Sequence, residues 1–326
     1  MRTASDPRHS EASTTVDRAA PCFHHEALFY AEDGFLDGTL PFIDEAVTAG
    51  EPILVAVSDA RMELLKEALG HDAEGVHFAE MGLRGRNPAR IIPAWRQFLE
   101  ANAPEGRLVR GVGEPIWPGR SRAELTECQR EESLLNLAFD DGQAWRLLCT
   151  YDLDGLDEQV IAAAHRSHPL IAQNGASRRS NTYVHPGEAP GSFDGPLPRP
   201  PTHAEELAFS GDELTMVRGF VGRCAARALL CAERREHLVL AVNELATNSV
   251  LHGGGRGTLR VWCEREALLC EVHDRGRIEE PLTGRTRPTP DQQSGYGLWL
   301  VNHLCDLVQI RSLPAGNVVR VHMFLV

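Results

Sequence analysis

A run of prolines and glycines near the middle of the chain constrains the fold more than any other feature. Six prolines lie in the stretch NGASRRSNTYVHPGEAPGSFDGPLPRPPT, which spans 174–202. Proline fixes φ and lacks a backbone N–H, so this stretch is expected to be extended and semi-stiff rather than part of a packed element. We therefore predict two domains, at 21–185 and 203–326, joined by a linker at 186–202.

The polar and acidic character of the chain limits the compartments and the kinds of partner that we expect. The first twenty residues are polar and lack the apolar stretch of a signal peptide, so 1–20 is expected to be a disordered leader. No run of 18 apolar residues occurs, which argues against a membrane span. A net charge of −13 repels nucleic-acid phosphates. We expect a cytoplasmic protein with protein and small-molecule partners, and no direct contact with nucleic acid or membrane.

The eight cysteines do not indicate a metal site by their spacing. No CxxC occurs, and no Cys/His cluster has the spacing of a zinc finger. Most of the cysteines lie inside apolar runs. Buried, reduced thiols are the expected state.

The first half alternates strand-like and helix-like segments, which predicts an α/β domain with a parallel sheet. The expected strands are Ala27–Tyr30, Pro52–Val57, Val76–Ala79, Arg107–Val112 and Arg146–Tyr151. The order is RecA-like, but no GxxxxGK[ST] loop is present. The residues at 31–38, where that loop would fall, include three Asp or Glu and no Lys, and would repel phosphates. This half is therefore expected to bind no nucleotide.

The second half has a different order, which predicts an α+β sandwich. Two helices are expected first, at 212–230 and 234–252, and then two adjacent strands, a polar loop at 277–294 and a helix. Two further strands close the chain. The expected positions of these later elements are 257–264, 267–273, 297–305, 307–312 and 318–326.

Three short patterns occur in the second half in a fixed order. The first is AVNELATNSVLH at 241–252, whose polar residues recur every four positions and so share one helix face. The second is EVHDRG at 271–276, which places an Asp and a Gly directly after a strand. The third is SGYGLWLV at 294–301, a glycine-rich turn that opens a helix. Such a turn lets backbone N–H groups approach phosphate, and the helix N-terminus adds positive potential.

Together these patterns resemble the N, G1 and G2 boxes of the GHKL superfamily of ATPases, most closely the anti-sigma-factor serine kinases of the RsbW type. The resemblance covers essentially all of 203–326 and implies an ATP site with Mg²⁺. By that resemblance Asn248 would hold the Mg²⁺ against the phosphates. Asp274 would accept a hydrogen bond from the adenine amino group, with Gly276 allowing close approach.

The resemblance also assigns the phosphate contacts and the catalytic group. Gly295, Gly297 and Leu298 would line the phosphates, and 277–294 would form a lid. Glu244 would orient or deprotonate the attacking hydroxyl, as a general base does. The family's last strand usually begins with a threonine that helps to bind adenine, and we align that position with Val318, a departure from the pattern.

The first half resembles the MEDS sensory domain, named for methanogens, methylotrophs and the DcmR regulator. The resemblance rests on HHEALFY at 24–30, GEPILVAV at 50–57, GEPIW at 113–117 and the Ser-His-Pro at 167–169. The combination of the two domains is similar to actinobacterial regulators of the RsbA type. It implies a sensor for an unknown small molecule or partner.

His25, Glu114 and His168 are the candidates for a sensory pocket, because all three are expected at strand edges. Two imidazoles and one carboxylate also form a common zinc or iron ligand set. Separate, satisfied polar residues are the simpler interpretation, and a pocket without metal is the favoured functional one. Glu131, ahead of an apolar run, is expected on a solvated helix face.

The leading hypothesis is an anti-sigma regulator that binds Mg-ATP, sequesters a sigma factor and has the residues to phosphorylate a serine of a STAS-type anti-sigma-factor antagonist. One alternative is a catalytically silent, ATP-dependent protein-binding module. Another is a sensor histidine kinase remnant, although the proline-rich stretch before the ATP domain cannot form the dimerising hairpin. RsbW-type domains commonly form dimers, so a homodimer is one possible oligomeric state.

Overall fold

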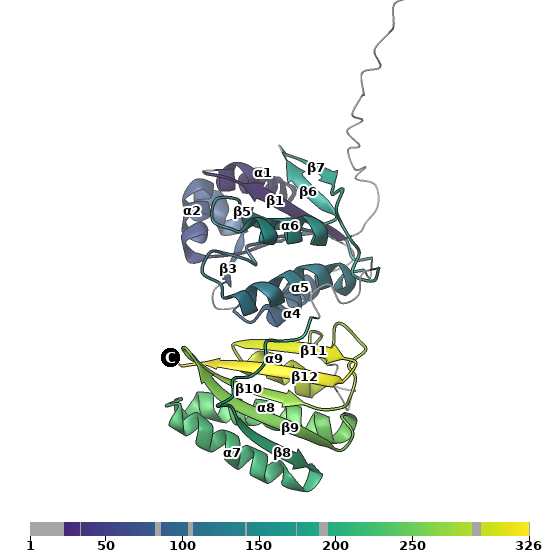
Figure 1. Ribbon diagram of the computed structural model, residues 1–326. Helices are drawn as coiled ribbons and strands as arrows, with labels where there is room; N and C mark the ends of the chain where they lie inside the picture. The colour runs from purple at the N-terminus through teal and green to yellow at the C-terminus, as the bar shows by residue number, and fades with distance from the viewer. Residues whose placement is uncertain are drawn as a thin grey trace, which may run out of the picture.

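The computed structural model describes residues 23–325 except 33, 82–85, 104–106, 141, 174, 189–194 and 289–294. The predicted leader and parts of the predicted linker and lid lie outside these residues. Within the described ranges, no helix is both long and apolar enough to cross a membrane. The chain builds two sheets, one from each half (Figure 1).

The first sheet has seven strands in the order β3-β2-β4-β5-β1-β6-β7. All neighbouring strands are parallel except β6 and β7, which are antiparallel. The strands are β1 (Phe23–Tyr30), β2 (Ile53–Val57), β3 (His77–Glu80), β4 (Val109–Gly113), β5 (Trp145–Asp152), β6 (Leu170–Gln173) and β7 (Ala176–Arg179). Short apolar strands separated by helical crossovers form such a sheet because both of its faces become buried.

Helices cover both faces of this sheet. Apolar side chains of α1 (Gly34–Ala49) and α2 (Asp59–Leu69) share one core cluster with β1, β2, β4 and β5. Those of α4 (Ile91–Asn102), α5 (Arg122–Ala138) and α6 (Glu158–Ser167) form a second cluster on the opposite face. A capping box at Ser121 and Glu124 fixes the start of α5.

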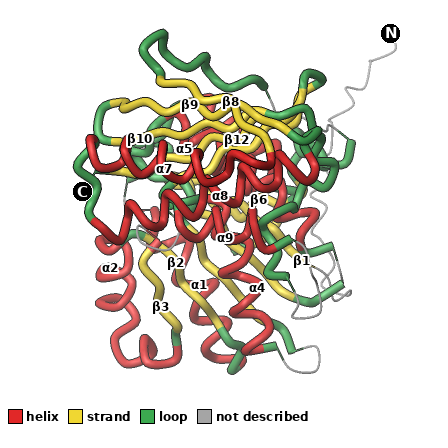
Figure 2. The backbone as a smooth tube through the Cα atoms, turned by 90° about the horizontal axis from the view of Figure 1, so that it is seen from below, coloured by secondary structure: helices red, strands yellow, loops and turns green. Residues whose placement is uncertain are grey.

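The second sheet is antiparallel, with its five strands in the order β11-β12-β10-β9-β8. The strands are β8 (Glu205–Ser210), β9 (Arg256–Glu264), β10 (Ala267–His273), β11 (Leu307–Leu313) and β12 (Gly316–Phe324). The helices α7 (Leu214–Arg227), α8 (Ala232–His252) and α9 (Tyr296–Leu304) pack their apolar faces on one side of it. Figure 2 shows α7 and α8 lying over these strands. The parallel N-terminal sheet and the helix-covered C-terminal sheet confirm the predicted fold class.

The two halves pack together through α4 and α5, which lie between the sheets (Figure 1). From α5, Glu127 pairs with Arg311 of β11 at 2.6 Å, and Glu131 pairs with Arg285 ahead of α9. All four side chains are buried. The prediction that Glu131 lies on a solvated face is wrong, because the second half of the chain covers that face of α5. Burial raises the pKa of Glu131, and Arg285 opposes that shift.

Candidate functional site

Helix α8 supplies the first part of the C-terminal site. Its buried residues, among them Leu245 and Ala246, face the core. Glu244 and Asn248 lie one turn apart on a half-buried face toward the start of α9. A Cβ placed on Gly297 would lie 3.2 Å from Glu244 Oε2 and 3.1 Å from Asn248 Nδ2. The glycine at this turn therefore sits directly against a carboxylate and an amide.

The turn that begins α9 has the conformation that its glycines allow. Gly295 adopts a positive φ of 99° at the helix N-cap, a region that L side chains rarely enter. The side chain of Leu298, one turn into the helix, is buried in the core and anchors the turn. The first backbone N–H groups of a helix have no acceptor within the helix, and this is how helix N-termini bind anions.

Asp274, which follows β10, is held by three hydrogen bonds. Its Oδ1 accepts from the backbone N–H of Gly276 at 2.8 Å and from Asn317 Nδ2 at 3.1 Å. Its Oδ2 accepts from the hydroxyl of Ser249, on α8, at 2.7 Å. A carboxylate offers about four lone-pair positions, so one acceptor position stays available for a ligand.

Two glycines near Asp274 lie so close to neighbouring backbone that neither position has room for a Cβ atom. A Cβ on Gly276 would lie 2.7 Å from the carbonyl of His252. A Cβ on Gly316, whose φ is +130°, would lie 1.8 Å from the carbonyl of Asp274. Gly276 lets the loop after β10 approach the end of α8, and Gly316 lets the start of β12 approach that loop.

Two residues of this site were not identified from the sequence. Ser249 follows Asn248 directly, so α8 presents one side chain to Gly297 and the next to Asp274. Asn317 meets Asp274 from β12, whereas Val318 pairs with His273 in the strand register. The structure thus places a polar side chain, Asn317, beside Asp274, one residue before the Val318 that we align with the family's threonine. A single sequence could not reveal this, because a shift of one residue in a strand reverses the side-chain direction.

The histidines predicted for the first half come together, but away from Glu114. The rings of His25 and His168 are 3.9 Å apart, and both side chains are fully buried. The carboxylate beside them is Glu132 of α5, whose Oε2 lies 3.1 Å from His168 Nε2. Glu114 instead accepts a hydrogen bond from the Ser58 N–H at 2.8 Å. Burial, with a smaller contribution from His168, lowers the pKa of His25 to about 4.

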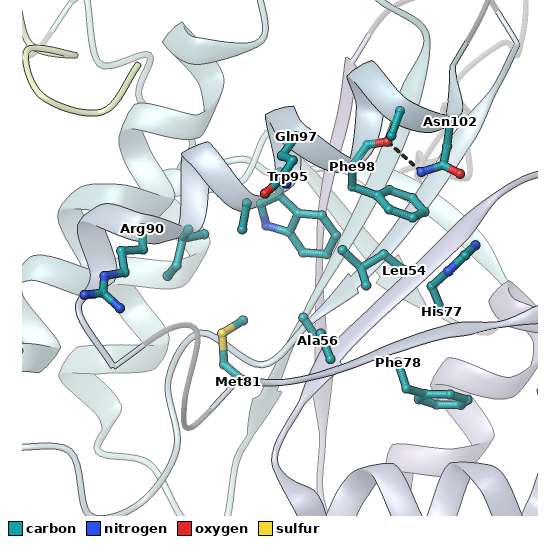
Figure 3. A pocket seen from close by; sticks show the side chains of 14 residues that line it. Leu54, Ala56, His77, Phe78, Met81, Arg90, Trp95, Gln97, Phe98 and Asn102 are labelled. Carbon is teal, nitrogen blue, oxygen red and sulfur yellow. Dashed lines mark hydrogen bonds between the residues drawn. The ribbon is translucent and has the colours of Figure 1, made fainter. Parts of the chain in front are cut away.

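An open cavity of about 300 Å³ lies elsewhere in the first half, between β2, β3 and α4 (Figure 3). Its lining is mostly apolar, with Leu54, Phe78, Trp95 and Phe98 among the residues that surround it. Arg90, at the N-terminal end of α4, also lines it. Apolar walls with a few polar groups are typical of small-molecule sites.

Both halves of the chain match known domain families. Residues 24–169 match the family described as MEDS, the methanogen/methylotroph, DcmR sensory domain. Residues 208–323 match the family described as the histidine kinase-like ATPase domain. Among curated proteins, none matches this chain.

Among solved structures, the chain is similar to the crystal structure of the RsbU and RsbW domains of a protein from Mycobacterium tuberculosis. The two are 16% identical with a TM-score of 0.28, over 64% of this chain and 49% of that chain. This chain thus spans about half the length of that relative. In domain organisation, the protein joins a stretch that matches a MEDS sensory domain to a stretch that matches a histidine kinase-like ATPase domain.

Proposed function

We propose that this chain is a cytoplasmic, ATP-dependent anti-sigma regulator of the RsbA type. In this proposal 203–326 binds Mg-ATP, holds a sigma factor and phosphorylates a serine of a STAS-type antagonist, while 21–185 acts as the sensor. The observation that carries the proposal is the convergence of Glu244 and Asn248 on the Gly297 turn, inside the region that matches an ATPase domain.

The residues at the site fit a magnesium nucleotide. Amide and carboxylate oxygens are the ligand type that Mg²⁺ prefers, and Asn248 would supply one of them. Gly297 would leave the backbone of the α9 turn open to the phosphates, with Gly295 and Leu298 beside it. Asp274 would take the adenine amino group, with Gly276 close by. Bound Mg²⁺ would neutralise charge on the phosphates during transfer.

Glu244 favours a kinase over a silent binding module. Its carboxylate faces the proposed phosphate turn, where a general base must lie to take the proton of an attacking hydroxyl. A histidine kinase remnant is not favoured. The described residues between β7 and β8 form no helix, so the phosphoacceptor hairpin has no counterpart there.

The sensor would act on the ATP domain through the C-terminal end of α9. Asn87 Nδ2 donates to the Asn302 carbonyl at 2.8 Å, and Arg90 Nε donates to the same carbonyl at 3.0 Å. Arg90 also donates to the His303 carbonyl. The last carbonyls of a helix have no intrahelical donor, and a cation there is favourable. The first half therefore caps the helix whose other end carries the Gly297 turn.

The same helix also contacts the segment at Gly284 and Arg285, which lies within the predicted lid at 277–294 and is called the lid base below. Asn302 Nδ2 donates to the Gly284 carbonyl at 2.9 Å, next to Arg285, which Glu131 holds. Arg90 lines the apolar cavity as well as capping α9. A small apolar ligand in that cavity would thus contact the element that holds α9. Such a ligand would shift the conformational equilibrium of the ATP domain only by the difference between its affinities for two conformations of the chain.

Breaking the Glu131–Arg285 pair is expected to release the lid base. Glu131→Gln leaves the buried Arg285 guanidinium without its carboxylate, which costs about 3–5 kcal/mol in buried pairs. We expect a lower melting temperature and faster amide hydrogen exchange in 278–288, measured by mass spectrometry on the full chain. Glu158→Gln, at an exposed position of α6, serves as the control. Unchanged exchange and melting in Glu131→Gln would contradict the proposed contact.

The proposed function is tested by incubating the full chain with labelled ATP, Mg²⁺ and the candidate antagonist proteins from the same genome. The expected result is label on a serine of one antagonist, together with capture of a sigma factor by the unmodified chain. Capture of a sigma factor with no transfer to any antagonist would establish the silent module instead.

A further inference from the structure

Four side chains with metal-binding atoms meet in the core of the first half, outside the ATP site. They are His25 of β1, Glu132 of α5, Cys149 of β5 and His168 at the end of α6. One ligand atom from each lies within 4.8 Å of all the others, and all four side chains are buried. They come from positions 25 to 168, so no local spacing in the sequence predicts the group.

The distances between these atoms suit one tetrahedral ion. Glu132 Oε2 lies 3.1 Å from His168 Nε2 and 3.6 Å from His25 Nε2. Cys149 Sγ lies 3.5 Å from His25 Nε2. Ligands at zinc distances of about 2.0–2.3 Å in a tetrahedron are separated by roughly 3.3–3.8 Å. The three separations are close to that range.

Both imidazoles are oriented with Nε2 toward the centre of the group. Asn136 Nδ2 donates to the Ser167 carbonyl at 2.8 Å, which leaves Asn136 Oδ1 to accept from His25 Nδ1–H at 3.1 Å. His168 Nδ1–H donates to the Ala164 carbonyl at 2.8 Å. With Nδ1 protonated in each ring, Nε2 carries the lone pair. A hydrogen bond from the far nitrogen is how proteins orient metal-ligating histidines.

Two buried polar atoms of the group make no hydrogen bond to the protein. His168 Nε2 and Glu132 Oε1 are buried without a hydrogen bond. The other carboxylate oxygen of Glu132 accepts from the Tyr151 hydroxyl at 2.8 Å, which fixes the direction of the carboxylate. Buried polar atoms without partners cost free energy, and a buried carboxylate needs a cation. A bound cation would give His168 Nε2 a partner and would neutralise the Glu132 carboxylate.

We propose that His25, Glu132, Cys149 and His168 bind one divalent transition-metal ion of the zinc type. Two neutral imidazoles, a carboxylate and a thiol match the nitrogen, oxygen and sulfur ligands that zinc takes. On binding, a metal–sulfur bond forms, the Cys149 S–H bond breaks, and the proton leaves to water. The dication with one carboxylate and one thiolate is neutral, so no net charge is buried.

The site would hold α5 against β1, β5 and the end of α6. Glu132 is adjacent to Glu131, which pairs with the lid base, so the metal would brace the helix at the contact between the two halves. The geometry of the core supports this site whether or not the C-terminal half is a kinase.

The test uses the full chain, stripped of metal by a chelator and then titrated with Zn²⁺ and, separately, Co²⁺. We expect one tightly held ion per chain and, with Co²⁺, an absorption band from thiolate-to-metal charge transfer. Cys149→Ser should lose that band, whereas Cys270→Ser, a buried strand thiol of the other sheet, should keep it. Asn136→Ala should weaken the affinity for Zn²⁺ about 10- to 100-fold, because it frees the ring of His25.

Two outcomes would overturn the proposal. One is a wild-type chain that takes up no tightly bound Zn²⁺ or Co²⁺ after chelation. The other is a Co²⁺ band and a metal stoichiometry that survive unchanged in both Cys149→Ser and His168→Gln, which would place the ion elsewhere. Because the first outcome is measured on the wild type, it does not depend on the folding of any variant.

Discussion

The Asp274→Asn variant is expected to bind ATP roughly tenfold or more weakly than the wild-type chain. The carboxylate already accepts from Gly276, Asn317 and Ser249, so its orientation is fixed before a ligand arrives. An amide at this position puts an N–H₂ group against groups that donate, and it accepts less strongly from the adenine amino group. Losing a hydrogen bond to a charged group costs about 1.5–3 kcal/mol.

Calorimetric titration with Mg-ATP measures this loss. Asp212→Asn, at an exposed position of the same half, is the control and should bind as the wild type does. Ser249→Ala is expected to weaken binding less, because it removes one support of the carboxylate and not the acceptor itself. Equal affinity in Asp274→Asn and the wild type would sink the adenine assignment.

The Glu244→Gln variant is expected to keep its ATP affinity and to lose phosphate transfer by about 100- to 10,000-fold. Glutamine has nearly the same shape but cannot take the proton of the attacking serine. The position of Glu244 against Gly297 places this change beside the transferred phosphate in the proposed complex. Initial rates of label transfer to the antagonist, at saturating ATP, measure the effect.

Glu236→Gln supplies the matched comparison, since Glu236 lies on the same helix but is exposed. It should transfer phosphate at the wild-type rate. Phosphate transfer at the wild-type rate in Glu244→Gln would show that Glu244 is not the general base. Because ATP affinity is measured separately, that result would not contradict the ATP site.

Most elements of the C-terminal half could be predicted from the sequence because their signals are local. The four-residue spacing on α8 and the glycine turn before α9 each specify a short segment by themselves. The strand β8 was missed, since Phe209 is its one buried residue and an edge strand with polar neighbours has a weak pattern. In the first half, the antiparallel strand β7 is likewise mostly exposed and polar.

The contacts between distant segments could not be predicted. Glu131 and Arg285 are 154 positions apart, and each alone resembles a solvent-exposed charge. Burial of such a pair depends on the packing of whole domains. The same reason hid Glu132 and Cys149 beside His25, although His25 and His168 were both candidates for one pocket at the sheet.

The second half of the chain is proposed to hold a single Mg-ATP. The most direct test of this claim is calorimetric titration of the full wild-type chain with ATP in the presence and absence of Mg²⁺. We predict saturable binding of one ATP per chain that weakens without Mg²⁺. No saturable binding up to millimolar ATP would contradict the claim, and so would two ATP per chain, because 31–38 lacks the lysine of a phosphate-binding loop.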